Sequence, residues 1–187
     1  MIHLRSTIRD IIERAQMEFS NDTRLCSVIQ EIPAMIIAGK KIGPISPPSQ
    51  IALPNWVIDT LVNHGYIEID PNEDYASIQH IQNVYRAEDD SPHKGLQSIH
   101  PLLYSAINKK LIEIRSERAS LDPKQYDEIE KLRRLIGIIS QKRLSKILRV
   151  AISGAYQDKR KDMTIEERWL CEELGVLASD WKNTLFM

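Results

Sequence analysis

The stretch that decides the fold of the N-terminal part lies between residues 43 and 65: Gly43-Pro44-Ile45-Ser46-Pro47-Pro48, then Leu53-Pro54-Asn55-Trp56, then Leu61-Val62-Asn63-His64-Gly65. Proline suits the first turn of a helix and glycine its C-terminal end, so a proline-rich turn is followed here by one short helix. This layout indicates a small α+β module placed ahead of a longer, helix-rich remainder.

Short runs of β-branched residues surround this helix. Residues 25–32 (LCSVIQEI) and 34–38 (AMIIA) are typical of strands, and Pro33 between them belongs at an edge or a bend because it cannot donate to a ladder. Residues 66–69 alternate as a third strand, and residues 6–19 have the spacing of a short amphipathic helix. The segment Gly39–Gly43 is expected to be a turn.

The rest of the chain is predicted to be helical. Apolar residues recur at helical spacing from Pro101, in three successive segments that stop near Gly154. Thr164-Ile165-Glu166-Glu167 is a capping box, which opens a final helix. The expected fold class is therefore α+β, with a small strand-rich N-terminal domain followed by a mainly α-helical bundle domain. Its predicted parts are an N-terminal helix extension (1–24), a small α+β domain (25–72), a linker with a short helix (73–100) and an α-helical domain (101–187).

Composition restricts the functional classes. The 187 residues are 42% hydrophobic and 27% charged, with a net charge of -1, as in an ordinary globular protein. No apolar run approaches the ~20 residues that cross a membrane, and the N-terminus has no apolar signal core. The two cysteines, Cys26 and Cys171, are far apart, which is typical of reduced thiols. We expect a cytoplasmic protein without a membrane partner.

The sequence offers no catalytic constellation. Its five histidines form no HxxxH or HExxH pair, and residues 39–43 lack the spacing of a phosphate-binding loop. Glu166 and Glu167 suit the first turn of a helix, where negative charge is favourable, and Glu172 and Glu173 suit a solvated face. We therefore predict no enzyme, no catalytic residue, no metal and no cofactor. An unrecognised nuclease or hydrolase is the alternative from the enzyme class.

Basic residues are concentrated in one helical stretch. Residues 105–161 contain 15 basic and 7 acidic side chains, while both flanks are acidic. Lys142, Lys146 and Arg149 follow helical spacing along one side of a helix, and Arg143 is adjacent. Three interpretations stay open: a solvated face, contact with an acidic protein partner, and contact with a DNA backbone. No aromatic residue is interleaved with the stripe, so base stacking is not predicted.

Several predicted helices are apolar on more than one side, which indicates burial all round. A bundle of this size cannot bury so much apolar surface alone, so a subunit interface is the simplest explanation. The candidate interface residues are Leu111, Ile114, Leu135, Ile138 and Ile139. In the small domain, the candidates for core packing or for a docking surface are Pro44, Leu53, Pro54, Trp56 and Leu61.

These residues resemble a known family. Gly43-Pro44, then Leu53-Pro54-Asn55-Trp56-Val57, Leu61, Tyr66-Ile67-Glu68-Ile69 and Pro71 are similar to the small domain of GINS replication-factor subunits, with Asn55 where leucine is usual. Residues 143–147 (RLSKI) and the capping box at Thr164 resemble the family's large α-domain. The small domain comes first, which is the order of one archaeal subunit. The helix at residues 6–19 and the long segment 76–100 depart from the family pattern.

The resemblance implies a non-catalytic function in DNA replication. GINS tetramers are replisome scaffolds that link the replicative MCM helicase to a RecJ-like partner, and archaeal complexes combine two copies each of two paralogous subunits. The implied partners are therefore a paralogous GINS subunit in a two-plus-two hetero-tetramer, MCM helicase and a RecJ-like protein, with a nucleoid-associated location in the cytoplasm. Weak DNA contact is compatible with this function. The alternative is a stand-alone DNA-binding protein that uses the basic stripe.

Overall fold

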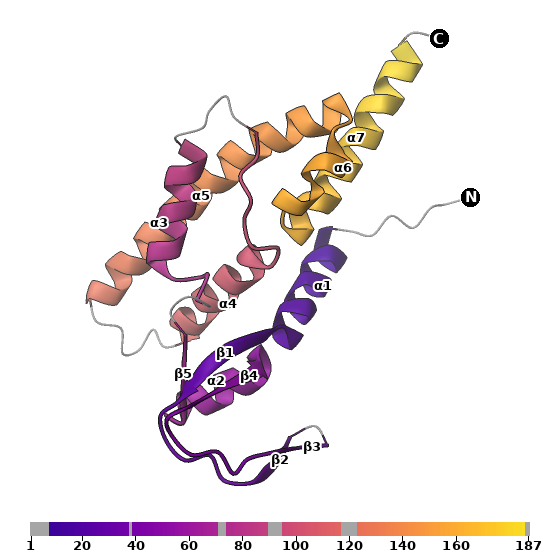
Figure 1. The fold of residues 1–187 in the computed structure, drawn as a ribbon. Coiled ribbons are helices and arrows are strands. Elements are labelled where there is room, and N and C mark those ends of the chain that lie inside the picture. Colours follow the sequence, from indigo (N-terminus) through magenta and orange to yellow (C-terminus); the bar gives the residue numbers. More distant parts are fainter. Residues whose placement is uncertain (1–7, 38, 71–73, 90–94, 117–122, 186–187) are drawn as a thin grey trace. The chain divides into compact units, whose positions relative to one another are not determined.

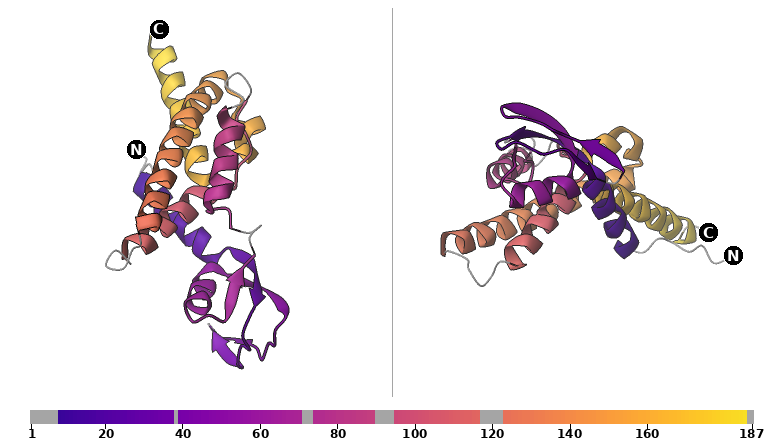
Figure 2. Two further views of the ribbon diagram at one scale, coloured as in Figure 1. Left: turned by 90° about the vertical axis from the view of Figure 1, so that its left-hand side faces the viewer. Right: turned by 90° about the horizontal axis from the view of Figure 1, so that it is seen from below.

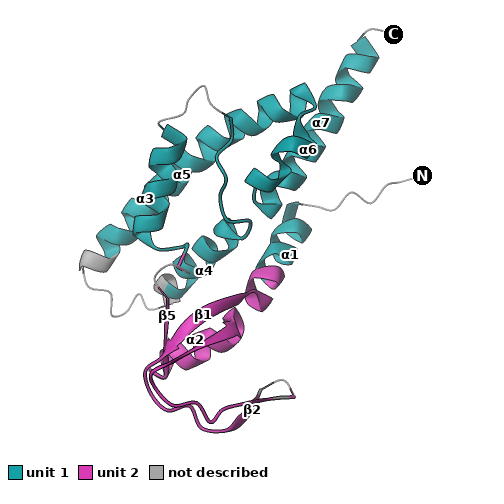
Figure 3. Ribbon diagram, viewed as in Figure 1, with its two compact units in different colours: residues 1–16, 75–187 teal, residues 17–74 magenta. Residues whose placement is uncertain are grey.

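The computed structural model describes residues 8–37, 39–70, 74–89, 95–116 and 123–185 (Figure 1). Its contacts divide the chain into two compact units: unit 1, residues 1–16 and 75–187, and unit 2, residues 17–74 (Figure 3). The described strands lie in unit 2, and the described elements of unit 1 are helical, so the predicted α+β class is confirmed.

Unit 2 contains a small antiparallel sheet and one helix. After α1 (Ile8–Asn21), which extends across the boundary at residue 16, its elements are β1 (Thr23–Val28), β2 (Met35–Ile37), β3 (Lys40–Ile42), β4 (Ser49–Pro54), α2 (Asn55–Asn63) and β5 (Ile67–Ile69). Strands β4, β1 and β5 form one sheet in that order, and β2 pairs with β3 in a separate hairpin. The first helix, β1 and β5 agree closely with the sequence-based expectations.

The core of unit 2 lies between α2 and the three-stranded sheet. Burial alternates along β1, so that Cys26 and Val28 face the core, as the two-residue period of a strand requires. Helix α2 contacts all three strands and contributes Val57, Ile58 and Leu61, each at most 4% exposed. This packing buries one face of a short helix that could not be stable alone.

Two expectations for this unit were wrong. Residues 40–42, expected to be a turn, form strand β3, and residues 49–54, where no strand was expected, form strand β4. Pro54 is the last residue of β4 and has extended backbone (ψ 147°), so α2 begins at Asn55 and not at Pro54. The strand β4 exists because it pairs with β1 over its whole length, from Thr23 opposite Pro54 to Val28 opposite Ser49. Local sequence patterns do not contain such long-range pairing.

Gly43 is required by a close approach of two backbone segments. Its φ is +80°, and a Cβ at this position would lie 2.7 Å from the carbonyl oxygen of Pro33. The neighbouring residues Ile32 and Ile45 exchange two backbone hydrogen bonds of 2.9 and 3.0 Å. A side chain on Gly43 would therefore be strained in its own backbone and would collide with residue 33.

Asn55 joins the start of α2 to the end of α1. Its side-chain NH2 donates to the carbonyl of Phe19 at 2.6 Å, and its backbone N–H donates to Asp22 at 3.0 Å. Its side-chain oxygen accepts from the guanidinium of Arg24, which stacks over the Phe19 ring. Asn55 is fully buried, so leucine here would remove two buried side-chain hydrogen bonds, to the Phe19 carbonyl and to the Arg24 guanidinium.

Unit 1 is organised around one long helix. Its further elements are α3 (Ile78–Asp89), α4 (Leu103–Ser116), α5 (Pro123–Ser153), α6 (Tyr156–Lys159), the 3-10 turn η2 (Arg160–Asp162) and α7 (Ile165–Leu185). Both α3 and α7 pack against α5 (Figure 2). The segment expected to be a linker is thus part of the helical unit, because α3 buries Ile81 and Val84.

The helix ends of unit 1 follow the sequence signals, whereas one predicted break does not occur. Two helices were expected within residues 126–151, but α5 is continuous there. It ends at Gly154, whose φ is +73°, as predicted. The capping box is also confirmed: the Glu167 N–H donates to the Thr164 hydroxyl (3.2 Å), and the Thr164 N–H donates to the Glu167 carboxylate (3.0 Å).

Candidate partner-binding surface

Only half of the predicted basic stripe lies at the surface. Arg143 is 0% exposed and Lys146 is 6% exposed, so half of the four proposed contact residues lie inside unit 1. Both face the same side of α5 as the buried Ile139 and Ile147, at positions i, i+4, i+7 and i+8 of the helix. The prediction that Arg143 and Lys146 contact an anionic partner is therefore wrong.

Arg143 uses all of its N–H donors inside the protein. Two of them bind the two carboxylate oxygens of Glu167, both at 2.7 Å, and a third binds Glu88. The remaining two bind the backbone carbonyls of Gln97 and Asp162, both at 2.8 Å. A guanidinium has five N–H donors, so the group is fully satisfied.

The two carboxylates are equally well satisfied, which makes this a complete buried network. Glu88 binds the ammonium group of Lys146 as well as Arg143, and Glu167 accepts a 2.8 Å hydrogen bond from the Tyr104 hydroxyl. Burial and the charge of Glu167 raise the pKa of Tyr104, so that this hydroxyl stays protonated and donates. The network connects α3, α4, α5 and α7, and its chemistry is structural.

Only Lys142 and Arg149 of the stripe reach the surface. Lys142 forms an ion pair with Asp89 and lies over the Tyr85 ring, and its pKa is raised by that hydrogen bond. Arg149 is exposed. Sequence reasoning missed Glu88 because it placed this residue in the linker at residues 73–100. The apolar neighbours of Arg143 and Lys146 on α5 were a usable signal that these two cations are buried.

The residues chosen in the small domain divide between core and surface. Leu53 and Leu61 are buried in the core of unit 2, and Pro54 is half-buried. Pro44 is exposed, and Trp56 is 41% exposed on α2, with the core contacts made by its neighbours on the helix. Of the two interpretations for Trp56, core packing is wrong, and a docking surface stays a prediction.

The residues chosen for a subunit interface are mostly not the ones that face solvent. Ile139 is 2% exposed and belongs to the core of unit 1, so its assignment to an interface is wrong. Leu111, Leu135 and Ile138 are half-buried within the chain. The side chain of Ile114 lies outside the described residues.

Two other rows of apolar side chains in unit 1 do face solvent. On α5 the row consists of Leu144, Leu148 and Ile152, which are 44–51% exposed. On α7 it consists of Leu177, Trp181 and Leu185, which are 55–63% exposed. Residues four apart lie on one face of a helix, so each row is continuous. We call these the α5 row and the α7 row.

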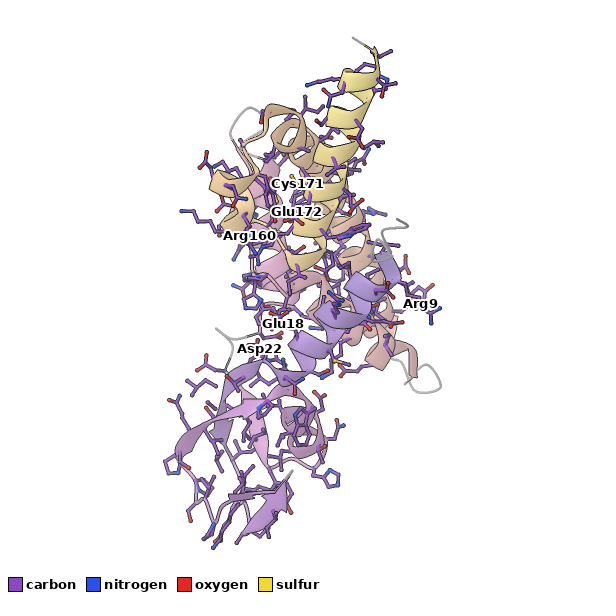
Figure 4. The ribbon with its side chains drawn as sticks, turned by 90° about the vertical axis from the view of Figure 1, so that its right-hand side faces the viewer. Arg9, Glu18, Asp22, Arg160, Cys171 and Glu172 are labelled. Atoms are coloured by element: carbon purple, nitrogen blue, oxygen red, sulfur yellow. The ribbon has the colours of Figure 1, made fainter. Side chains whose placement is uncertain are left out.

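An open groove lies between the end of α5 and α7, and Ile152 is the one residue of the two rows that lines it. The groove has a volume of about 540 Å³, and Ile152 and Val176 line it together with the small residues Ala151, Gly154, Gly175, Ala178 and Ser179. Cys171 and Glu172 on α7 line it as well (Figure 4). Burial raises the pKa of the Cys171 thiol, which keeps it protonated. A concave surface lined mainly by apolar and small residues, one of them from the α5 row, suits protein contact more than chemistry.

The described parts of the chain contain no group of three or more His, Cys, Asp or Glu side chains placed to hold a metal ion. One carboxylate there is poorly paired: Glu166 accepts from the Ser105 hydroxyl at 3.3 Å, while its other oxygen is buried without a hydrogen bond. Burial raises the pKa of Glu166. Within the described ranges, no helix has both the length and the apolar character that crossing a membrane needs.

A scan of the sequence against protein-family models gives no match, and a search of the curated proteins gives none either.

Proposed function

We propose that this chain is a non-catalytic assembly subunit of the GINS type, which binds a paralogous subunit and links the MCM helicase to a RecJ-like partner during DNA replication. The observation that supports it most is the solvent exposure of the α5 row and the α7 row on the helical unit. Large apolar side chains in continuous rows are usually covered by a partner, because isolated monomers rarely expose contiguous apolar surface.

The domain order gives further support. A small α+β unit precedes the helical unit, in agreement with the resemblance at Gly43-Pro44 and Leu53-Pro54-Asn55-Trp56. In the proposed complex, the paralogous subunit covers the helical unit in a two-plus-two hetero-tetramer, and the exposed Trp56 leaves unit 2 able to dock on a further protein.

The alternative function, stand-alone DNA binding, depended on the basic stripe. Two of its four cations neutralise buried carboxylates, and a third, Lys142, is paired with Asp89. Cations that are already neutralised inside the protein contribute little to counterion release from DNA. No other described feature favours this function, and we do not propose it.

The proposal is tested by co-purification with the paralogous subunit. Leu144→Asp with Leu148→Asp places two charges on the α5 row, and we expect it to abolish the complex while the circular dichroism spectrum stays unchanged. The matched control is Ile36→Asp, which charges a 78% exposed apolar residue of unit 2 and should leave the complex of the helical units intact. A wild-type chain that never co-purifies with the paralogue would refute the proposal.

A further inference from the structure

Strand β4 has one hydrogen-bonding edge without a partner in the described chain. It is an edge strand of the three-stranded sheet and pairs with β1 on one side only (Figure 1). The Asn55 N–H donates to the Asp22 carbonyl, and bonded and non-bonded pairs alternate along an antiparallel ladder. The bonds to β1 therefore come from residues 49, 51 and 53. The backbone N–H and C=O groups of Gln50 and Ala52 point away from the sheet.

These four outward groups are open to contact. Gln50 and Ala52 are both exposed, and no described residue forms a backbone hydrogen bond with their outward groups. The opposite edge of the sheet differs, because Ile67 of β5 is only 1% exposed and its backbone is therefore covered. An added strand would join the sheet at β4 and not at β5.

The sequence of β4 does not protect this edge, but prolines limit its length. Natural edge strands are commonly protected by charged side chains, and Ser49–Pro54 contains none. Pro48 and Pro54 lack an N–H, so the outward donors of this strand are those of Gln50 and Ala52. Pro54 is also the N-cap of α2, a position whose carbonyl accepts the first hydrogen bond of the helix. A long foreign strand would therefore gain no more bonds from β4 than a short one.

We propose that β4 pairs with β4 of a second copy of this chain, antiparallel and centred on Ile51. In this register, Gln50 of each copy lies opposite Ala52 of the other, and four hydrogen bonds satisfy every outward donor and acceptor of the two edges. A register centred on Gln50 or on Ala52 places the other of these two residues opposite a proline, which cannot donate. The edge is thus complementary to itself in one register.

The side chains fit the same arrangement. Ile51 is half-buried and packs at the border of the core of unit 2, which includes Leu53. In the paired sheets, the two copies of Ile51 lie opposite each other as a non-hydrogen-bonded pair, in which side chains approach most closely. On the other face, Gln50 and Ala52 are uncharged, so no like charges meet. Because the β5 edge is covered at Ile67, the pairing closes at two copies and does not continue as a fibre.

The contact is small. Two short strands bury less than the ~1,000 Å² of a stable interface, so the isolated chain should dimerise only at high concentration. The inference deepens the proposed function and rests on it for the remaining contacts of the complex. In a two-plus-two assembly, the paralogous subunits hold two copies of this chain together and raise their effective concentration.

A cysteine at the centre of the pairing tests the register. Ile51→Cys places two thiols opposite each other, with Cα atoms about 4.5 Å apart, a distance that a disulfide can bridge. The matched control, Ser49→Cys, lies on the same face of β4, but its two thiols are about 14 Å apart along the strands. Under mild oxidation of the concentrated full chain, we expect a covalent dimer from Ile51→Cys and none from Ser49→Cys. Cys26 and Cys171 are buried, so the wild-type chain is the blank.

Removing the donor at residue 52 tests the hydrogen bonds. Ala52→Pro deletes an outward N–H but keeps the ladder to β1, and it should weaken dimerisation in sedimentation equilibrium about 30-fold, the effect of two lost hydrogen bonds. Ala52→Val keeps the N–H and should dimerise like the wild type. Equal disulfide formation by Ile51→Cys and Ser49→Cys would overturn the proposal, and so would equal dimerisation of well-folded Ala52→Pro and Ala52→Val. The cysteine pair decides the question if Ala52→Pro does not fold.

The outcomes separate this inference from the proposed function. If the paralogous subunit binds but Ile51→Cys forms no disulfide in the free chain or in the complex, the inference fails and the assembly function stands. If the disulfide forms but the paralogue does not bind, the pairing is real and the GINS-type function fails. If Ala52→Pro weakens binding of the paralogue and Ile51→Cys forms no disulfide, β4 accepts a strand of the paralogue and the proposal is wrong.

Discussion

Replacing Arg143 by methionine is the sharpest test of the structural account. The substitution keeps a long side chain of similar length but removes the charge and all five donors. Glu88 and Glu167 then remain buried, with Lys146 as the only cation in the network. The structure therefore predicts that this substitution severely destabilises the protein, although the sequence pattern placed Arg143 on an exposed basic stripe.

The size of the loss follows from the burial of the pair. The side chains of Arg143 and Glu88 are both 0% exposed and that of Glu167 is 5% exposed, so solvent screening is small. Removing one partner of a buried ion pair costs about 3–5 kcal/mol, because the other charge stays buried and unpaired. This is a large fraction of the roughly 5–15 kcal/mol by which domains are stable. For a chain of this length it corresponds to a fall in Tm of about 6–20 °C.

The assay must report on unit 1 alone. The chain has three tryptophans, and in a Trp56→Phe background the remaining two, Trp169 and Trp181, lie on α7. Urea unfolding followed by tryptophan fluorescence then gives the free energy of unfolding of unit 1. The matched control is Arg149→Met, which removes an exposed cation of the same helix and should change the free energy of unfolding by no more than about 0.5 kcal/mol.

The double variant Arg143→Met with Glu88→Gln adds a check on the mechanism. Since the second substitution removes one of the unpaired charges, the double variant should be less unstable than the sum of the single effects. Exposed ion pairs contribute up to about 1 kcal/mol, so a buried pair must exceed this value. Free energies of unfolding of Arg143→Met and Arg149→Met that differ by less than about 1 kcal/mol would therefore refute the reasoning.

Three further predictions concern single residues. Gly43→Ala should destabilise unit 2 by about 1–3 kcal/mol more than Gly39→Ala, measured by thermal unfolding, because both have positive φ but only Gly43 would place a Cβ against Pro33. Because the pKa of Tyr104 is raised in the folded protein, its contribution to stability is complete below pH 10 and is lost as the pH rises above this value. The urea midpoint of Tyr104→Phe should therefore fall less steeply with alkaline pH than that of the wild type. Equal slopes of urea midpoint against pH would contradict this. Burial raises the pKa of Glu166, so wild-type stability should fall relative to Glu166→Gln as pH rises from 4.5, and urea midpoints with no such divergence would show the carboxylate to be well solvated.

Local signals in the sequence predicted the parts of the fold that depend on local chemistry. The helical spacing of α1, the alternation of β5, the glycine at the end of α5 and the capping box at Thr164 all correspond to observed elements. Each of these features is determined by backbone preferences within a few residues. The same reasoning wrongly divided α5, because the spacing of its apolar residues was taken as a break although neither proline nor a helix-ending signal lies between Ile139 and Leu144.

The features that sequence reasoning missed depend on contacts between distant segments. Strand β4 pairs with β1, and its Ala52 lies opposite Leu25. Glu88 binds Arg143 and Lys146, which lie 55 and 58 residues away in the sequence. A single sequence does not reveal which distant residues are in contact, so Arg143 and Lys146 look like two more charges on a basic helix. Only their positions on the face that also contains Ile139 and Ile147 indicate that they are inside.

The subunit interface stays a prediction, and the described residues chosen for it are not the apolar side chains that face solvent. Apolar helical surface is exposed, yet it consists of the α5 row and the α7 row, while Ile139 is buried in the chain. The spacing of apolar residues shows that a helix is apolar on more than one side. It does not show which of these sides is covered by the rest of the same chain. That choice is made by the packing of α3 and α7 on α5.

If another protein completes the apolar surface of the helical unit, the mass of the assembled complex will show it. The chain should be co-expressed with the paralogous subunit and examined by size-exclusion chromatography with light scattering. We expect one stable species that contains two copies of each chain. A well-folded monomer of 21.5 kDa, unchanged by the presence of the paralogue, would contradict it.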